Sequence, residues 1–349
     1  MNKTGAILLI CLTVLGTLTV QAAWAAQPGP LFPVVQNGAW GYINKTGRMI
    51  IPPRFDNAFP FAEGLARVKL NNRWGFIGPA GQMVIAPRFD FAKGFAQGRA
   101  IVEIDNGWTF IDQTGRIITP LRFSYVRPFS QGLAPVQTKG LWGYLDLSGK
   151  MAVAARYDHA LSFSQDRGAV QKDGKWGYID STGKLVIPFQ YDRASSFQNG
   201  LAHVRPARGG KFGYIGLDGQ MVIPEIYDQA ARFSEGLAAV KKDGLWGYVD
   251  PRGRWVIPAR FQEARRFSQG RALVRLGNKW GFIGASGKII IEPRFDYASD
   301  FAEGRAHVRI GERWAHVDKE GLAVSQQEFD YVWNFSHGLA MVMIVGKWG

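Results

Sequence analysis

The feature that most constrains this sequence is a phrase of about ten residues that returns at a nearly fixed spacing. Its clearest copy reads KWGYIDSTGK at residues 175–184. The aromatic residue near its start recurs every 34 residues, with a single step of 36. The series is Trp40, Trp74, Trp108, Trp142, Trp176, Phe212, Trp246, Trp280, Trp314 and Trp348. Such a period is typical of a tandem repeat, whose units become stable only when they stack on their neighbours.

Within each repeat we number positions from this aromatic residue, which is position 0. Position +2 is aromatic in eight of the nine full repeats, and position +3 is always apolar. This alternation predicts a β-strand that buries positions 0 and +2 on one face. Position +7 is always glycine and follows a polar stretch, which predicts a hairpin turn with a positive φ angle. A second apolar strand follows, and we expect proline, as in Pro188, to end it.

The second half of each repeat carries a different pattern. Position +15 is Phe or Tyr, position +16 is usually Asp, and position +21 is Phe. The spacing Asp-x-Ala-x-x-Phe predicts a short helical turn capped by the aspartate. Valine at position +28 lies at the centre of a third predicted strand. Each repeat is therefore expected to be a three-stranded antiparallel meander with an additional packed loop.

These patterns predict an all-β fold made of about ten units of roughly 34 residues. We expect an open twisted array, because the number of units exceeds the usual range for a propeller. The alternative is a closed, propeller-like ring. A single repeat domain, residues 26–349, would contain nine full repeats and a partial tenth.

The first 25 residues have the pattern of a secretory signal peptide. Lys3 gives a positive start, residues 6–20 are apolar, and residues 23–25 form a small-x-small cleavage site. The alternative is an uncleaved membrane anchor. Removal of this segment would also remove Cys11, so we expect no disulfide. The sequence predicts an exported protein that is periplasmic, displayed on the cell surface or secreted, with no further membrane span.

Four phrases identify a family resemblance across residues 32–349. They are KWGYID-x-TGK, VIP, YD-x-A and FS-x-GLA-x-V, and they resemble the WG-repeat family of bacteria. This resemblance implies an exported or surface β-repeat protein with no catalytic residues to transfer. Thr109 and Ala315 replace the glycine at position +1, and Phe212 replaces the tryptophan, so we expect weakened units there.

No constellation in the sequence indicates catalysis, a metal or a cofactor. The histidines fall at unrelated phases, except His203 and His307, which are three repeats apart. The repeated aspartate at +16 is expected to be structural, since a catalytic carboxylate pair would be unique in the chain. We therefore predict neither catalytic residues nor cofactor or metal ligands.

A recurring arginine at position +14 is the candidate binding feature. It could form two rows along one edge of the array and bind carboxylate or phosphate groups. The alternative is that each arginine stacks on the aromatic residue beside it or pairs with the aspartate at +16. The six candidates are Arg54, Arg88, Arg122, Arg156, Arg260 and Arg294.

The functional hypothesis is an exported, non-enzymatic binding or scaffold protein for a protein or an envelope polymer. A net charge of +14 favours anionic partners such as acidic glycans or lipid head groups, whereas export argues against nucleic acid. One alternative is a glycan hydrolase or lyase with its site in a central channel. The other is an anion-binding envelope protein that uses the arginine rows.

Overall fold

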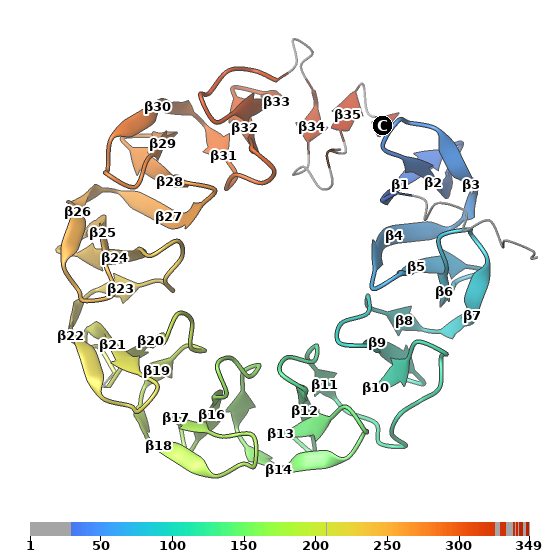
Figure 1. Cartoon of the computed structure of the whole chain (residues 1–349), viewed down its shortest axis with the longest axis horizontal. Coiled ribbons are helices and arrows are strands. Elements are labelled where there is room, and N and C mark those ends of the chain that lie inside the picture. Colours follow the sequence, from blue (N-terminus) through green and yellow to red (C-terminus); the bar gives the residue numbers. More distant parts are fainter. Residues whose placement is uncertain are drawn as a thin grey trace, which may run out of the picture.

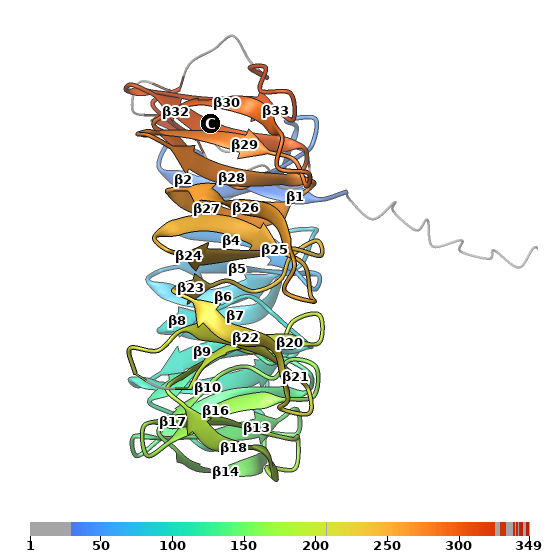
Figure 2. The same ribbon diagram turned by 90° about the vertical axis from the view of Figure 1, so that its left-hand side faces the viewer.

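A computed structural model shows an all-β chain. It describes residues 29–206, 208–324 and 329–332, together with 338, 340, 342–344 and 347–348; the predicted signal peptide lies outside this part. Ten antiparallel sheets follow one another in the described residues. Figure 1 shows them arranged around a ring, and Figure 2 shows the ring edge-on as one layer of sheets. The all-β tandem repeat is therefore confirmed.

The array is open in that no sheet of the described part of the chain combines strands from its two ends, and no strand pairing joins one sheet to the next. It is therefore not a continuous hydrogen-bonded barrel. Its outline is nevertheless ring-like, and Figure 1 shows the last sheet beside the first.

A full sheet contains four strands in meander order, which we call the inner, second, third and outer strand. Figure 1 shows the outer strands on the periphery of the ring and the inner strands nearer its centre. The inner strands are β4 (Asn57–Ala62), β8 (Phe91–Ala92), β11 (Tyr125–Val126), β15 (His159–Ala160), β19 (Arg193–Ala194), β23 (Gln229–Ala230), β27 (Glu263–Ser268), β31 (Tyr297–Ala298) and β34 (Tyr331–Val332). The second strands are β1 (Leu31–Gln36), β5 (Leu65–Leu70), β9 (Arg99–Ile104), β12 (Leu133–Thr138), β16 (Gly168–Lys172), β20 (Leu201–Arg205), β24 (Ala238–Lys242), β28 (Arg271–Leu276), β32 (Arg305–Ile310) and β35 (Val342–Ile344).

The third strands carry the repeated Trp-Gly phrase. They are β2 (Ala39–Asn44), β6 (Arg73–Ile77), β10 (Gly107–Asp112), β13 (Leu141–Asp146), β17 (Lys175–Ile179), β21 (Phe212–Gly216), β25 (Leu245–Val249), β29 (Lys279–Ile283), β33 (Arg313–Asp318) and β36 (Lys347–Trp348). The outer strands are β3 (Met49–Phe55), β7 (Met83–Phe89), β14 (Met151–Tyr157), β18 (Leu185–Tyr191), β22 (Met221–Tyr227), β26 (Trp255–Phe261) and β30 (Ile289–Phe295).

The structural unit is offset from the sequence repeat. Sheet β15–β18 begins at His159 in one repeat and ends at Tyr191 in the next. A full sheet therefore has four strands, one more than the predicted three-stranded unit. The predicted helical turn is wrong, because the Asp-x-Ala segment forms the inner strand. The N–H of Asp192 donates to the carbonyl of Arg205 at 2.7 Å, which holds this segment extended along β20.

Proline does not end the outer strand, contrary to the prediction. Pro188 lies within β18, which continues to Tyr191. Because β18 is the outermost strand of its sheet, the missing proline N–H removes no bond from a central ladder.

The hydrophobic core lies between neighbouring sheets. One cluster joins Trp142 and Tyr144 of sheet β11–β14 to Phe163 and Val170 of sheet β15–β18. The aromatic residue at +2 is its centre: Tyr144 is fully buried and its hydroxyl donates to the carbonyl of Leu161 at 2.8 Å. The repeats therefore bury apolar surface only against one another, as the pattern predicts.

Glycine at position +1 allows the outer strand to approach. A Cβ added at Gly143 would lie 2.5 Å from the carbonyl oxygen of Val153, and the register of β13 and β14 shifts at this point. Thr109 occupies the same position in the preceding sheet, and there the outer strand is reduced to two isolated bridges. The unit with Thr109 thus lacks a complete outer strand, whereas the sheet that contains Phe212 is complete; that these units are weakened stays a prediction.

Polar side chains at position +23 connect one sheet to the next. The carboxylate of Glu63 accepts hydrogen bonds from the N–H groups of Gln97 and Gly98 at 2.7 and 2.8 Å. The side chain of Gln97 accepts in turn from the N–H of Gly132 at 3.0 Å. In a further connection, the Arg99 guanidinium donates to the Leu147 carbonyl at 2.8 Å. Backbone donors at these turns are thus satisfied by the preceding repeat.

Candidate functional site: a basic groove along the inner strands

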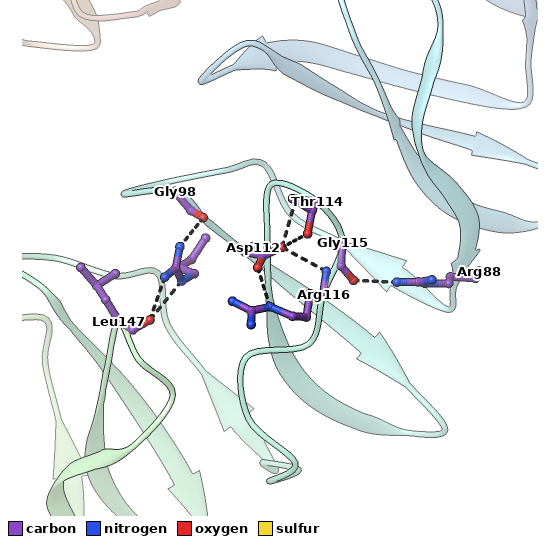
Figure 3. Close-up of polar contacts among 8 residues, drawn as sticks. Arg88, Gly98, Asp112, Thr114, Gly115, Arg116 and Leu147 are labelled. Atoms are coloured by element: carbon purple, nitrogen blue, oxygen red, sulfur yellow. Dashed lines mark hydrogen bonds and ion pairs between the residues drawn. The ribbon is translucent and has the colours of Figure 1, made fainter.

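The six predicted arginines are exposed, and five of them lie on outer strands of the sheets. Arg156 is representative: its Nη2 donates to the carbonyl of Gly183 at 2.9 Å, in the next sheet, and its guanidinium lies 5.3 Å from the ring centre of Tyr157. Figure 3 shows the equivalent bond from Arg88 to Gly115, at 2.6 Å. The same pair of contacts recurs at Arg54, Arg260 and Arg294.

Arg122 is the exception in this series. Its Nη1 lies 3.5 and 3.4 Å from the carbonyls of Pro120 and Leu121, within its own loop. The outer strand that orients the other five arginines is reduced to bridges here. Five of the six arginines therefore stack on the neighbouring aromatic residue, which is the alternative that the sequence left open. Anion binding by these arginines stays a prediction.

The aspartates at +16 support hairpins and pair with cations. The carboxylate of Asp228 accepts from the N–H of Gly244 at 3.2 Å and forms an ion pair with Lys211. Asp192 forms a 2.6 Å ion pair with Arg205. The pKa of each carboxyl group is lowered, chiefly by a hydrogen bond from a cationic side chain. The donor is Arg205 for Asp192 and Lys211 for Asp228. Both carboxylates are therefore ionised at neutral pH, when they can only accept hydrogen bonds.

Four arginines line a concavity along the inner strands β15 and β19. This concavity, of about 550 Å³, is lined by Arg127, Arg193, Arg205 and Arg208, with Asp192 as its acidic residue. Arg205 is paired with Asp192, whereas the side chains of Arg193 and Arg208 have no hydrogen bond or ion pair with any described residue. The remaining lining residues are His159, Ala160, Leu161, Gln171, Gly174 and Trp176.

A second concavity, of about 520 Å³, adjoins the first. Arg193 and Arg205 line both, so the two form one basic groove across sheets β15–β18, β19–β22 and β23–β26. The second concavity is also lined by Ala194, His203, Phe212, Asp228, Gln229 and Ala230. Burial, with a smaller contribution from Arg232, lowers the pKa of His203 to about 4, so this side chain is neutral at pH 7.

Sequence reasoning missed this groove. Arg193 occupies position +17, where other repeats place Phe91, Tyr125 or His159. Arg208 comes from the two-residue insertion, which the sequence alone suggests only as a tolerated turn. The available signal was the coincidence of the insertion with arginines at residues 193, 205 and 208.

Among the described residues, no group of three or more histidine, cysteine, aspartate or glutamate side chains could hold a metal ion. The same part of the chain contains no helix long and apolar enough to cross a membrane.

Comparison with known proteins identifies the repeat. The sequence model described as "WG containing repeat" matches nine consecutive segments: residues 40–74, 74–108, 108–142, 142–176, 176–205, 212–246, 246–280, 280–314 and 317–348. No curated protein matches the sequence.

Among solved structures, a eukaryotic initiation factor aligns with 86% of this chain and 96% of its own, at 14% identity and a TM-score of 0.57. This similarity concerns the fold alone. A streptogramin B lyase aligns with 63% of this chain and 90% of its own, at 14% identity and a TM-score of 0.34.

Proposed function

The chain belongs to the WG-repeat family, and on that premise we propose that it is a non-catalytic binding protein for an anionic polymer. The basic groove is the observation that carries this proposal. The side chains of two of its arginines, Arg193 and Arg208, make no hydrogen bond or ion pair with the described residues, and guanidinium groups bind carboxylates and phosphates in a bidentate manner.

The shape of the groove supports a polymer over a small molecule. Its two concavities share lining residues and extend over three sheets. Weak contacts to successive anionic groups would add through their linkage, so that affinity increases with the length of the bound chain.

Binding of a panel of polyanions at two salt concentrations tests this function. We expect polygalacturonate, polyglutamate or polyphosphate to bind with an affinity that falls steeply with added salt, because exposed charges are screened. The double variant Arg193→Gln/Arg208→Gln should bind at least tenfold more weakly. The control Arg252→Gln/Lys288→Gln removes the same charge from exposed positions outside the groove. Absence of binding to every polyanion, or equal loss in both double variants, would contradict the proposal.

We also propose export as the route by which the protein meets its polymer. The support is the pattern of the first 25 residues. Intact-mass measurement on protein recovered from the cell envelope tests it, since a chain that still begins at Met1 would favour the anchor.

A further inference from the structure

The basic groove repeats the same positions in consecutive sheets. Position +17 supplies one lining residue from each of three sheets. His159 lines the first concavity, Gln229 lines the second, and Arg193 lines both. Position +16 contributes Asp192 to the first concavity and Asp228 to the second. A ligand that crosses from one to the other therefore meets a similar set of groups again.

The groove offers hydrogen-bond acceptors as well as cations. The carboxylates of Asp192 and Asp228 lie in its walls beside the guanidinium groups, and the side-chain amide of Gln229 makes no hydrogen bond with the part of the chain that the structure describes. Two ionised carboxylates would repel a ligand whose surface is phosphate alone, whereas they accept hydrogen bonds from hydroxyl groups. The set fits a chain that carries both anionic groups and hydroxyls.

Two other modes of polymer recognition fit the groove less well. Addition of a peptide strand needs a long free edge, but the inner strands β15, β19 and β23 each have two residues. Stacking of nucleic-acid bases needs open aromatic faces. The His159 ring stacks against Trp176, and the Arg205 guanidinium lies 5.3 Å from the ring centre of Phe212. Trp176 and Phe212 also pack against core clusters.

We propose that the basic groove binds an acidic polysaccharide, which crosses from one concavity to the other and places its carboxylates on Arg193 and Arg208. Its hydroxyl groups bond to Asp192, Asp228 and Gln229. This inference rests on the proposed function and specifies its ligand. Arg193 determines specificity in it, because this residue lines both concavities.

Calorimetric titration with galacturonate oligomers of increasing length tests the inference. We expect affinity to increase at least tenfold from the monomer to an oligomer that spans both concavities, and then to level off. Arg193→Gln should lose at least tenfold in affinity for the long oligomer, while Arg193→Lys retains part of that affinity. Arg252→Gln is the matched single-charge control and should stay within twofold of the parent.

The failures of this inference and of the proposed function are distinguishable. If polyphosphate or single-stranded RNA binds more tightly than oligogalacturonate, or if oligomer length has no effect, the polysaccharide assignment is wrong although anion binding stands. If no polyanion binds, both proposals fail. Thermal melting of each variant provides the folding check, and an Arg193→Gln variant that melts like the parent but binds the long oligomer equally well overturns the role of Arg193.

Discussion

Neighbouring sheets β8–β10 and β11–β14 have different residues at position +1 and different architectures. Sheet β11–β14 has Gly143 at position +1, and its outer strand β14 pairs along Trp142, Tyr144 and Leu145. Sheet β8–β10 has Thr109 there, and the segment that would be its outer strand keeps only isolated bridges. The fourth strand of a sheet therefore forms where the third strand has no Cβ at this position.

The difference extends to the contacts between sheets. Arg156, on β14, reaches the next hairpin at Gly183, whereas Arg122, in the irregular segment, bonds within its own loop. The hairpin after the third strand is the same in both sheets, since Asp112 and Asp146 each accept hydrogen bonds from the residue two positions later. Sheet β8–β10 therefore differs in this region, where it lacks the outer strand and the arginine contact to the next sheet.

Replacement of the tryptophans should give the largest difference. Trp142 is buried and belongs to a core cluster, whereas Trp108 is half-buried and packs at the edge of one. We expect Trp142→Ala to lower the free energy of unfolding by about 4 kcal/mol and Trp108→Ala by about 2 kcal/mol. Urea denaturation of both variants measures this. Equal losses would show that the irregular sheet is packed as well as the regular one.

Exchange of the residue at position +1 tests the comparison directly. Gly143→Thr would place side-chain atoms against the carbonyl of Val153, and we expect a loss of about 3 kcal/mol. Thr109→Gly, the matched change, should cost about 1–2 kcal/mol, because it removes a buried side chain and its hydrogen bond to the Thr119 carbonyl but introduces no clash with an outer strand. Hydrogen exchange of β14 amides should show that Gly143→Thr opens this strand. Protection equal to that of the parent would contradict the role assigned to glycine.

Replacement of the arginines at position +14 should give a smaller difference in the free energy of unfolding. Arg156→Gln removes a hydrogen bond between sheets and a cation–π contact, so we expect a loss of about 1 kcal/mol. Arg122→Gln should cost about 0.5 kcal/mol or less, because its contacts are local and exposed. Denaturation midpoints compare the two, and an equal effect would remove the structural distinction between them.

The acid dependence of the two hairpins should differ least. Burial alone would raise the pKa of Asp112, but hydrogen bonds from Thr114 and Arg116 outweigh it and lower the value to about 2. The pKa of Asp146 is lowered by the corresponding bonds from Ser148 and Lys150, which likewise outweigh burial. Because a folded-state pKa below the unfolded value of about 3.9 favours folding above that value, this contribution is lost as pH falls toward 2.

Denaturation between pH 5 and pH 2 measures this dependence. Asp112→Asn and Asp146→Asn should each weaken it by a similar amount. A change in one variant alone would mean that the hairpins differ after all.

Much of the fold was predictable because its demands repeat. Glycine at +7 is required by a positive φ in every hairpin, for example +85° at Gly183, and the aromatic residue at +2 is buried in each core. The offset of the sheets was not predictable from apolar periodicity, because each strand pattern is compatible with pairing to the preceding or the following third strand. The Asp192 segment also lacks any pattern that separates a capped turn from a two-residue strand.

The candidate site was harder to predict for the opposite reason. Arg193 and Arg208 occur once each and carry no periodic signal, whereas repetition drew attention to arginines such as Arg88, which contact the next sheet. Exposed positions of a repeat tolerate many residue types, so their chemistry becomes visible only when the concavity that gathers them is known.

The offset between repeat and sheet has a consequence for how such chains change in length. Each interior sheet joins the end of one repeat to the start of the next, as β15–β18 does between His159 and Tyr191. A deletion or duplication of one whole repeat, begun at any phase among the regular four-stranded sheets, keeps the strand order of each sheet. Recombination between repeats can therefore lengthen or shorten the surface that carries the groove, wherever in the repeat it occurs. The change in the curvature of the ring would be distributed over the remaining interfaces between sheets.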